Sequence, residues 1–311
     1  MSTRLPKNKA KKEHWVPFSY LKNFAIPGTK NHKEPKAWIF SKDQGDPKPV
    51  PVRSFARKKF LYSPRDKHSN RSWETEDKLH NLESLMSRIW PSFDEGLVDF
   101  VGNASIKKGL ALYMATLFLR HPSNIKLIKS IHSQLTDLYE SLTKDERGNP
   151  FIGEVIYKGK SIPFDNSGYK EYKSADDNDF QHMFVDFINS EARGCAEILL
   201  EKRWSMIFSE TPVFITTDNP VVVENLERER FGLSTKGTII TFPISPTRLL
   251  VLDDLKNEPN GRYYPLGNHG PGPINLSLWR GSKENMLSHR HTDEVISEML
   301  AWADEYEKEN V

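Results

Sequence analysis

The sequence predicts an α+β protein in which a helical body of four to five helices packs against a C-terminal, mainly antiparallel β-sheet. Three observations support this class. Apolar residues recur at three- and four-residue spacing between residues 73 and 204, which is the period of amphipathic helices. Residues 110–119 are apolar on nearly all sides, so a helix there must be buried. After residue 204 the pattern changes to short β-rich runs divided by Pro, Asn and Gly.

The N-terminal region precedes the helices. Residues 1–12 are basic and are predicted to form a flexible tail before a single domain, 13–311. The run Trp38-Ile39-Phe40 predicts a short strand. Residues 45–53 contain three prolines and should run extended or in turns.

Four long helices are expected in the middle of the chain. The first covers 73–101, with an interruption at Pro91, and the second covers 107–122. The third begins at Ser123, a residue type that caps helices. The fourth covers 176–204 and has an acidic start, which the helix dipole favours.

Strands dominate the C-terminal third. Before this third, a hairpin or excursion of the chain is expected near 154–164. At its end, a helix from about Thr292 closes the chain. Thr216 to Asn219 are predicted to form a turn between two strands, because Asp and Asn suit turn geometry and Pro220 follows. The predicted late strands are 204–209, 212–217, 220–225, 237–245 and 248–253.

Composition narrows the class of protein. Hydrophobic residues make up 37% and charged residues 28% of the 311 residues, as in soluble globular proteins. No apolar run approaches the roughly 18 residues that span a bilayer, and no secretory h-region follows the basic N-terminus. Cys195 is the only cysteine, which excludes an intramolecular disulfide and a cysteine zinc cluster. We therefore expect a cytoplasmic protein without a membrane partner.

Basic residues are clustered although the formal net charge is only +2. Such clusters can contact phosphates, so a nucleic acid or nucleotide is the predicted partner. The alternative is a solvated tail and a solvated loop, which is the commoner role of charge runs. The candidate nucleic-acid-binding residues are Lys9, Lys11, Lys12, Arg57, Lys58 and Lys59.

Four polar residues in apolar contexts are candidate catalytic residues: His14, Arg120, Asp218 and Asn219. Histidine serves as a general acid or base near neutral pH, so His14 is the candidate proton carrier. Asp218 can orient that histidine or bind a metal. Arg120 ends the apolar helix and needs a carboxylate or phosphate partner if buried. Each also has a structural alternative, as a cap, a turn former or an ion-pair partner.

Two carboxylates on the first long helix are candidate metal ligands. Glu76 and Glu83 are two helical turns apart and project from one face. Together with Asp218 they could hold a divalent ion, Mg²⁺ or Mn²⁺. The alternatives are an ion pair with Arg120 or an exposed face, which Lys78 nearby favours.

Two motifs show a family resemblance. The opening reads His14-x-x-Pro17-x-x-Tyr20-Leu21-x-x-Phe24, and a Thr-Asp-Asn-Pro segment occurs at 217–220. In this order they resemble a bacterial family catalogued as domain of unknown function 4238. The resemblance runs from His14 to the final helix and implies no activity. The other matching residues are Phe60, Tyr62, Glu76, Glu83, Arg120, Pro122, Trp204, Pro243, Ser245 and Pro246.

Two functions are compatible with these residues. The first is hydrolysis of phosphodiesters in nucleic acid or nucleotides, as in a toxin-like or phage-defence effector, with His14, Arg120 and Asp218 in one site. The second is a non-catalytic module that binds nucleic acid or protein and in which these residues are structural. Convergence in an open pocket favours catalysis, whereas burial with satisfied partners favours the structural role.

Overall fold

The computed structural model describes residues 11–96, 99, 102–147, 150–151, 154–157, 159–163 and 166–309. Within these residues the helices are α1 (Phe18–Leu21), α2 (Glu74–Asp94), α3 (Ala104–Leu119), α4 (Ser123–Ser141), α5 (Tyr169–Lys173), α6 (Asp177–Glu201), α7 (Gly272–Gly281) and α8 (Thr292–Glu309). The strands are β1 (Lys12–His14), β2 (Lys36–Ser41), β3 (Gln44–Pro51), β4 (Arg57–Lys59), β5 (Glu154–Tyr157), β6 (Lys160–Pro163), β7 (Arg203–Phe208), β8 (Thr216–Thr217), β9 (Val222–Glu224), β10 (Ile239–Ser245), β11 (Arg248–Asp253), β12 (Arg262–Pro265) and β13 (Asn285–Ser288).

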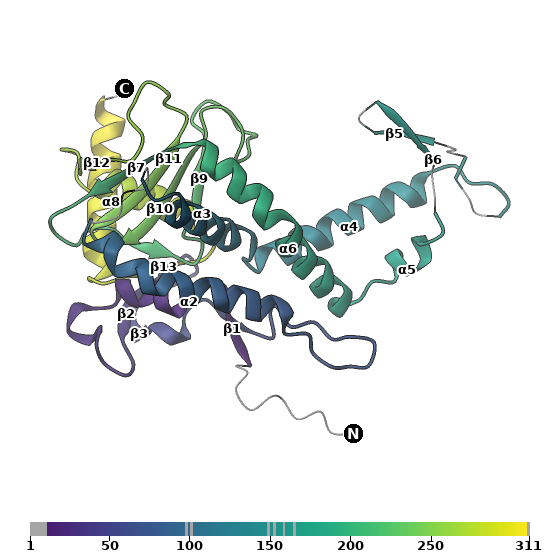
Figure 1. Cartoon of the computed structure of the whole chain (residues 1–311), viewed down its shortest axis with the longest axis horizontal. Helices are drawn as coiled ribbons and strands as arrows, with labels where there is room; N and C mark the ends of the chain where they lie inside the picture. Colours follow the sequence, from purple (N-terminus) through teal and green to yellow (C-terminus); the bar gives the residue numbers. More distant parts are fainter. Residues whose placement is uncertain are drawn as a thin grey trace.

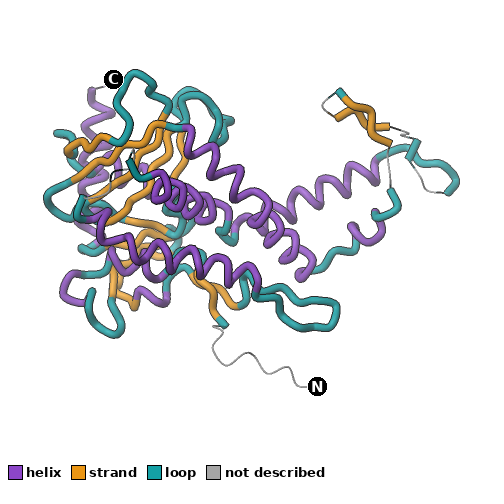
Figure 2. The backbone as a smooth tube through the Cα atoms, in the orientation of Figure 1, coloured by secondary structure: helices purple, strands orange, loops and turns teal. Residues whose placement is uncertain are grey.

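The class is α+β, but the predicted arrangement of a helical body and one C-terminal sheet is wrong. The described residues contain eight α-helices, and sheets of two, four and five strands are mixed through the chain (Figure 2). The four-stranded sheet has the order β3-β2-β13-β8, so strands from both ends of the chain pair with each other. A local apolar period cannot reveal such pairing, because the two partners are chosen by tertiary packing.

The five-stranded sheet contains most of the predicted late strands, in the order β12-β7-β11-β10-β9. Only β12 and β7 run parallel within it. The predicted turn at Thr216 to Asn219 needs correction. Thr216 and Thr217 form β8 of the four-stranded sheet, whereas β9 belongs to the five-stranded one. The Thr-Asp-Asn-Pro segment therefore carries the chain from one sheet to the other.

Prolines lie where their missing N–H groups are tolerated. The proline-rich stretch 45–53 falls largely in β3, the edge strand of its sheet, where only one side needs donors. Helix α2 continues through Pro91 to Asp94, although an interruption was predicted, because the proline sits in the last turn. A Gly/Pro-rich stretch begins α7 with Pro in its first turn, which suits a helix start.

Helix α3 is the central core helix, as its apolar run predicted. Leu110, Met114 and Leu117 are buried, and α3 packs against α2 and α6. The four- and five-stranded sheets lie at the end of the molecule away from α4, α5 and the predicted hairpin β5–β6 (Figure 1). Within the described part of the chain, no helix combines the length and apolarity that a membrane span requires.

Candidate functional site

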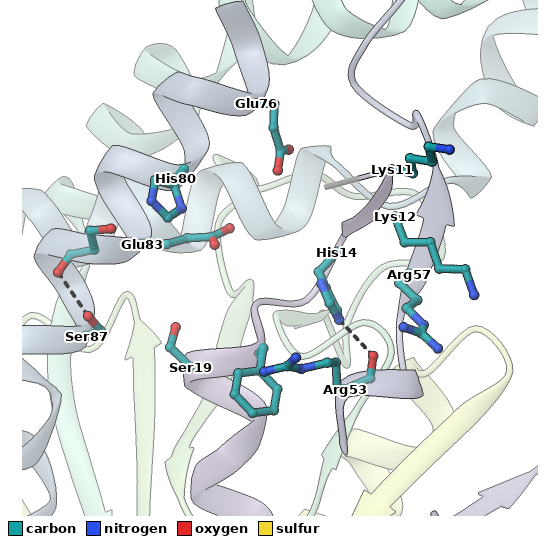
Figure 3. Close-up of a pocket in the computed structure, with 12 residues that line it drawn as sticks. Lys11, Lys12, His14, Ser19, Arg53, Arg57, Glu76, His80, Glu83 and Ser87 are labelled. Carbon is teal, nitrogen blue, oxygen red and sulfur yellow. Dashed lines mark hydrogen bonds between the residues drawn. The ribbon is translucent and has the colours of Figure 1, made fainter. Parts of the chain in front are cut away.

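A cleft of about 770 Å³ opens between the paired strands β1 and β4 and helix α2 (Figure 3). Its strand-side wall carries four cationic side chains, and its helix wall carries two carboxylates and a histidine. The lining residues are Lys11, Lys12, His14, Phe18, Ser19, Arg53, Arg57, Glu76, His80, Glu83, Ser84 and Ser87. The cleft is the candidate functional site because it gathers groups of opposite charge around His14, with a second histidine, His80, on the helix wall.

The helical period of α2 builds one wall. Glu76, His80, Glu83 and Ser87 are spaced by three or four residues, so they share the face that lines the cleft. Leu79, between them in sequence, is buried on the core side. Figure 3 shows Glu76 and Glu83 directed toward the open space that His14 borders. The two carboxylates predicted to share a face therefore do so, and that face is the cleft.

The pairing of β1 with β4 builds the opposite wall. His14 lies opposite Arg57, and Lys12 lies opposite Lys59 in this antiparallel pair. Side chains alternate along a strand, so Glu13 points the other way and is only 1% exposed. Its carboxylate accepts hydrogen bonds from the Tyr62 backbone N–H at 2.6 Å and from the Ser63 hydroxyl. The buried Glu13 thus anchors β1 and turns His14 toward the cleft.

The protonation of His14 follows from its contacts. Its Nε2 lies 3.1 Å from the carbonyl oxygen of Arg53, and a carbonyl only accepts, so Nε2 carries the proton. Burial lowers the pKa of His14 below its ordinary value of 6.5, although the Arg53 contact opposes this shift. The ring is therefore neutral at pH 7, and Nδ1 is the nitrogen that can accept a proton.

Arg120 lies behind the cleft rather than in it. Its side chain is 1% exposed, and its Nη1 pairs with Glu83 Oε1 at 2.7 Å. Its Nε donates to the carbonyl of Trp15 at 2.8 Å, and its own carbonyl accepts from the Tyr62 hydroxyl at 3.0 Å. Arg120 therefore holds Glu83 in place and ties α3 to the segment after His14. Of the two carboxylates, Glu76 and Glu83, that the sequence offered as partners of Arg120, Glu83 is the one that pairs with it.

Asp218 is a structural anchor in this structure. It is 2% exposed, and its carboxylate accepts three backbone N–H groups, from Lys283 at 2.9 Å, Glu284 at 2.8 Å and Asn285 at 3.1 Å. Burial raises the pKa of Asp218, while these hydrogen bonds oppose that shift. Asn219 donates to the carbonyl of Gly281 at 2.9 Å. Neither residue is among those that line the cleft.

Trp15 connects the three predicted catalytic positions without bringing them into one cavity. Its indole N–H donates to the backbone carbonyl of Asp218 at 3.0 Å, and its own carbonyl accepts from Arg120. His14, the last residue of β1, directly precedes Trp15 in the chain. The structure therefore links His14, Arg120 and Asp218 through one residue, but only His14 reaches the cleft.

The predicted metal ligands are not gathered in one place. Glu76 and Glu83 line the cleft, whereas both oxygens of Asp218 bond to backbone N–H groups elsewhere. Across the described ranges, no three or more His, Cys, Asp or Glu side chains form a cluster suited to a metal ion.

The predicted nucleic-acid-binding residues fall into two cavities. Lys11, Lys12 and Arg57 line the cleft. Lys58 and Lys59 line a second cavity beside it. Lys9 lies outside the described residues.

Several lining residues escaped sequence reasoning. His80, Ser84 and Ser87 continue the spacing of Glu76 and Glu83 along α2, so extending that helical face would have found His80 and Ser87. Arg53 belongs to the same basic run of the sequence as Arg57, and a short 3₁₀ turn, η3 (Val52–Ser54), places it at the cleft.

The fold and the cleft define an α+β protein with a cationic and carboxylate-lined cleft. The chain belongs to the family described as protein of unknown function (DUF4238), whose family model matches residues 12–303. This match confirms the resemblance carried by the two motifs. No curated protein and no solved structure matches the chain significantly.

Proposed function

We propose that the chain hydrolyses phosphodiesters of nucleic acid or nucleotides in this cleft. The observation that supports the proposal is the placement of His14 between four cationic side chains and two carboxylates in a single open cavity. Cations on one wall can hold phosphate oxygens, and a neutral histidine beside them can accept a proton.

The proposed reaction uses residues of both walls. A water molecule attacks phosphorus and gives its proton to Nδ1 of His14, while the bond from phosphorus to the leaving oxygen breaks. His80 on α2 gives a proton to the leaving oxygen. Lys12, Arg53 and Arg57 stabilise the charge that builds on the phosphate oxygens. Arg120 is a positioning residue that acts through Glu83.

A cleavage assay tests the proposal. Labelled single- and double-stranded DNA, RNA and dinucleotides are incubated with the wild type and with His14→Ala, with Mg²⁺ or Mn²⁺ and with EDTA. His32→Ala is the matched control, because His32 is exposed and does not line the cleft. We expect cleavage by the wild type and the control and a loss of about 100-fold or more in His14→Ala. Equal rates for His14→Ala and the control would refute the role of His14.

The second candidate is a non-catalytic module that binds nucleic acid. The satisfied partners of Asp218 and the ion pair of Arg120 favour it, because both residues have structural roles. The same substrates distinguish the candidates when binding is measured by fluorescence polarisation. Binding by the wild type without turnover under any of these conditions would favour the module over the hydrolase.

A further inference from the structure

We infer that the cleft and the cavity beside it are consecutive subsites of one binding track, so that the ligand is a single-stranded oligonucleotide and not a free nucleotide. This inference rests on the proposed function, because it assigns a substrate class to the same cleft. The track follows strand β4, which contributes Arg57 to the cleft and Lys58 and Lys59 to the second cavity.

The second cavity is smaller and strongly basic. It has a volume of about 310 Å³ and carries four cationic side chains and one carboxylate. Lys129 neutralises that carboxylate through an ion pair of 2.5 Å with Asp177. Arg71 donates to the carbonyl of Ser63 and lies over the Phe60 ring, so Lys58 and Lys59 are the two cations that remain to face a ligand. The lining residues are Lys58, Lys59, Phe60, Leu61, Arg71, Ile125, Lys129, Asp177 and Gln181.

A backbone hydrogen bond lies between the two cavities. The backbone N–H of Phe60, in the second cavity, donates to the carbonyl of Lys11, in the first, at 3.0 Å. Strand β4 runs from one cavity to the other, since Arg57 lines the cleft and Lys58 and Lys59 line the second cavity. At about 3.3 Å per residue, Arg57 to Phe60 spans about 10 Å. A stacked strand covers that length with about three nucleotides, at about 3.4 Å each.

Phe60 gives the second cavity an aromatic surface. The Arg71 guanidinium lies over one face of the Phe60 ring, 3.7 Å from its centre, so a base could stack only on the opposite face. Phe60 has a φ of +52°, a left-handed conformation that costs a bulky residue free energy. An aromatic ring next to lysines is the arrangement on which unpaired bases stack. In a duplex, bases are paired and stacked on each other, so this surface favours a single strand.

The carboxylates near the track do not oppose a polyanion there. Glu13, which lies opposite Lys58 in the strand pair, is buried and bonded to Tyr62 and Ser63. Glu76 and Glu83 lie on the opposite wall of the first cleft. By the alternation of side chains along β4, Arg57 faces the cleft and Lys58 faces the second cavity, so the strand presents cations to both.

The test compares a mononucleotide and a single strand of twelve nucleotides, both labelled with fluorescein, by fluorescence polarisation on the full chain. Lys58→Ala/Lys59→Ala removes two exposed cations from the second cavity. Arg228→Ala/Arg230→Ala is the matched control, because it removes two exposed cations from a loop that lines neither cavity. Phe60→Leu removes the aromatic face and keeps an apolar side chain. Circular dichroism confirms the fold of each variant.

We expect Lys58→Ala/Lys59→Ala to weaken binding of the twelve-mer about tenfold and to leave the mononucleotide within twofold. The slope of log K against log salt for the twelve-mer should become shallower by about 1.4, which is 0.7 for each lost phosphate contact on a single strand. Phe60→Leu should weaken the twelve-mer without changing this slope. The control should behave as the wild type.

Two results overturn the inference, and they have different meanings. If the wild type binds both ligands equally and the lysine variant matches the control, the second cavity is not a subsite, although the proposed function stands. If the wild type binds neither ligand and cleaves no substrate, the proposed function fails and the track fails with it.

Discussion

The ion pair between Arg120 and Glu83 allows a quantitative prediction. Glu83→Gln keeps the size of the side chain and removes its charge, which leaves the guanidinium of Arg120, 1% exposed, without its carboxylate. Removing one partner of a fully buried pair costs about 3–5 kcal/mol. Glu83 is 23% exposed, and glutamine still offers an acceptor oxygen. We therefore expect the free energy of unfolding to fall by about 2–3 kcal/mol.

A control on the same helix isolates the effect of burial. Glu74 pairs with Lys78 at the same distance, 2.7 Å, but the side chains are 72% and 58% exposed. Glu74→Gln should therefore leave stability unchanged within error, because exposed pairs contribute little. The two variants differ in the burial of the pair and share the chemistry of the substitution.

Urea denaturation and a thermal scan measure the difference. At about 2.1 cal/mol/K per residue, the entropy of unfolding of 311 residues is about 0.65 kcal/mol/K. A loss of 2–3 kcal/mol then lowers Tm by about 3–5 °C. If Glu83→Gln and Glu74→Gln unfold within about 0.5 kcal/mol of each other, the buried pair does not anchor the cleft wall and the reasoning is wrong.

Three further predictions concern pH and the buried carboxylate. Because burial lowers the pKa of His14, the rising limb of the pH–rate profile should have its inflection below 6.5; a rising limb with its inflection above 6.5 contradicts His14 as the base. Burial, with a smaller effect of Lys283, lowers the pKa of His121 to about 4, so the unfolded chain binds more protons between pH 4 and 6.5. Stability should therefore fall with decreasing pH, by about 2 kcal/mol from this group between pH 7 and 5, and urea denaturation of His121→Gln should show a smaller fall. Asp218→Asn should destabilise the fold by about 1–3 kcal/mol, because its amide N–H₂ cannot accept from the backbone N–H groups it faces. The folded protein should keep its activity, and a normal urea midpoint combined with lost cleavage would instead favour the catalytic role.

Local patterns predicted much of the helical structure and one wall of the site. The apolar run 110–119 required burial, and α3 is the core helix. The spacing of Glu76 and Glu83 placed them on one face of the helix. This result does not depend on which part of the protein that face contacts. These inferences succeed because the helical period is set by backbone geometry within a few residues.

The rest depended on contacts between distant residues. The partner of β2 is β13, and the carboxylate of Asp218 finds its donors in the backbone at Lys283 to Asn285. Backbone N–H groups are the same at every residue but proline, so the sequence carries no sign of which ones a carboxylate will meet. Asp218 and Asn219 were therefore predicted to be catalytic, whereas in the structure they anchor their segment to residues 281–285.

By itself, the sequence determined the family, the central helix and the shared face of Glu76 and Glu83, because short motifs and local periods carry that information. Tertiary structure decided which polar residues meet. It withdrew Arg120 and Asp218 into the interior, where burial demands partners, and left His14 at an open cleft beside Arg57. That division follows from packing, which sets the burial and the neighbours of each charge.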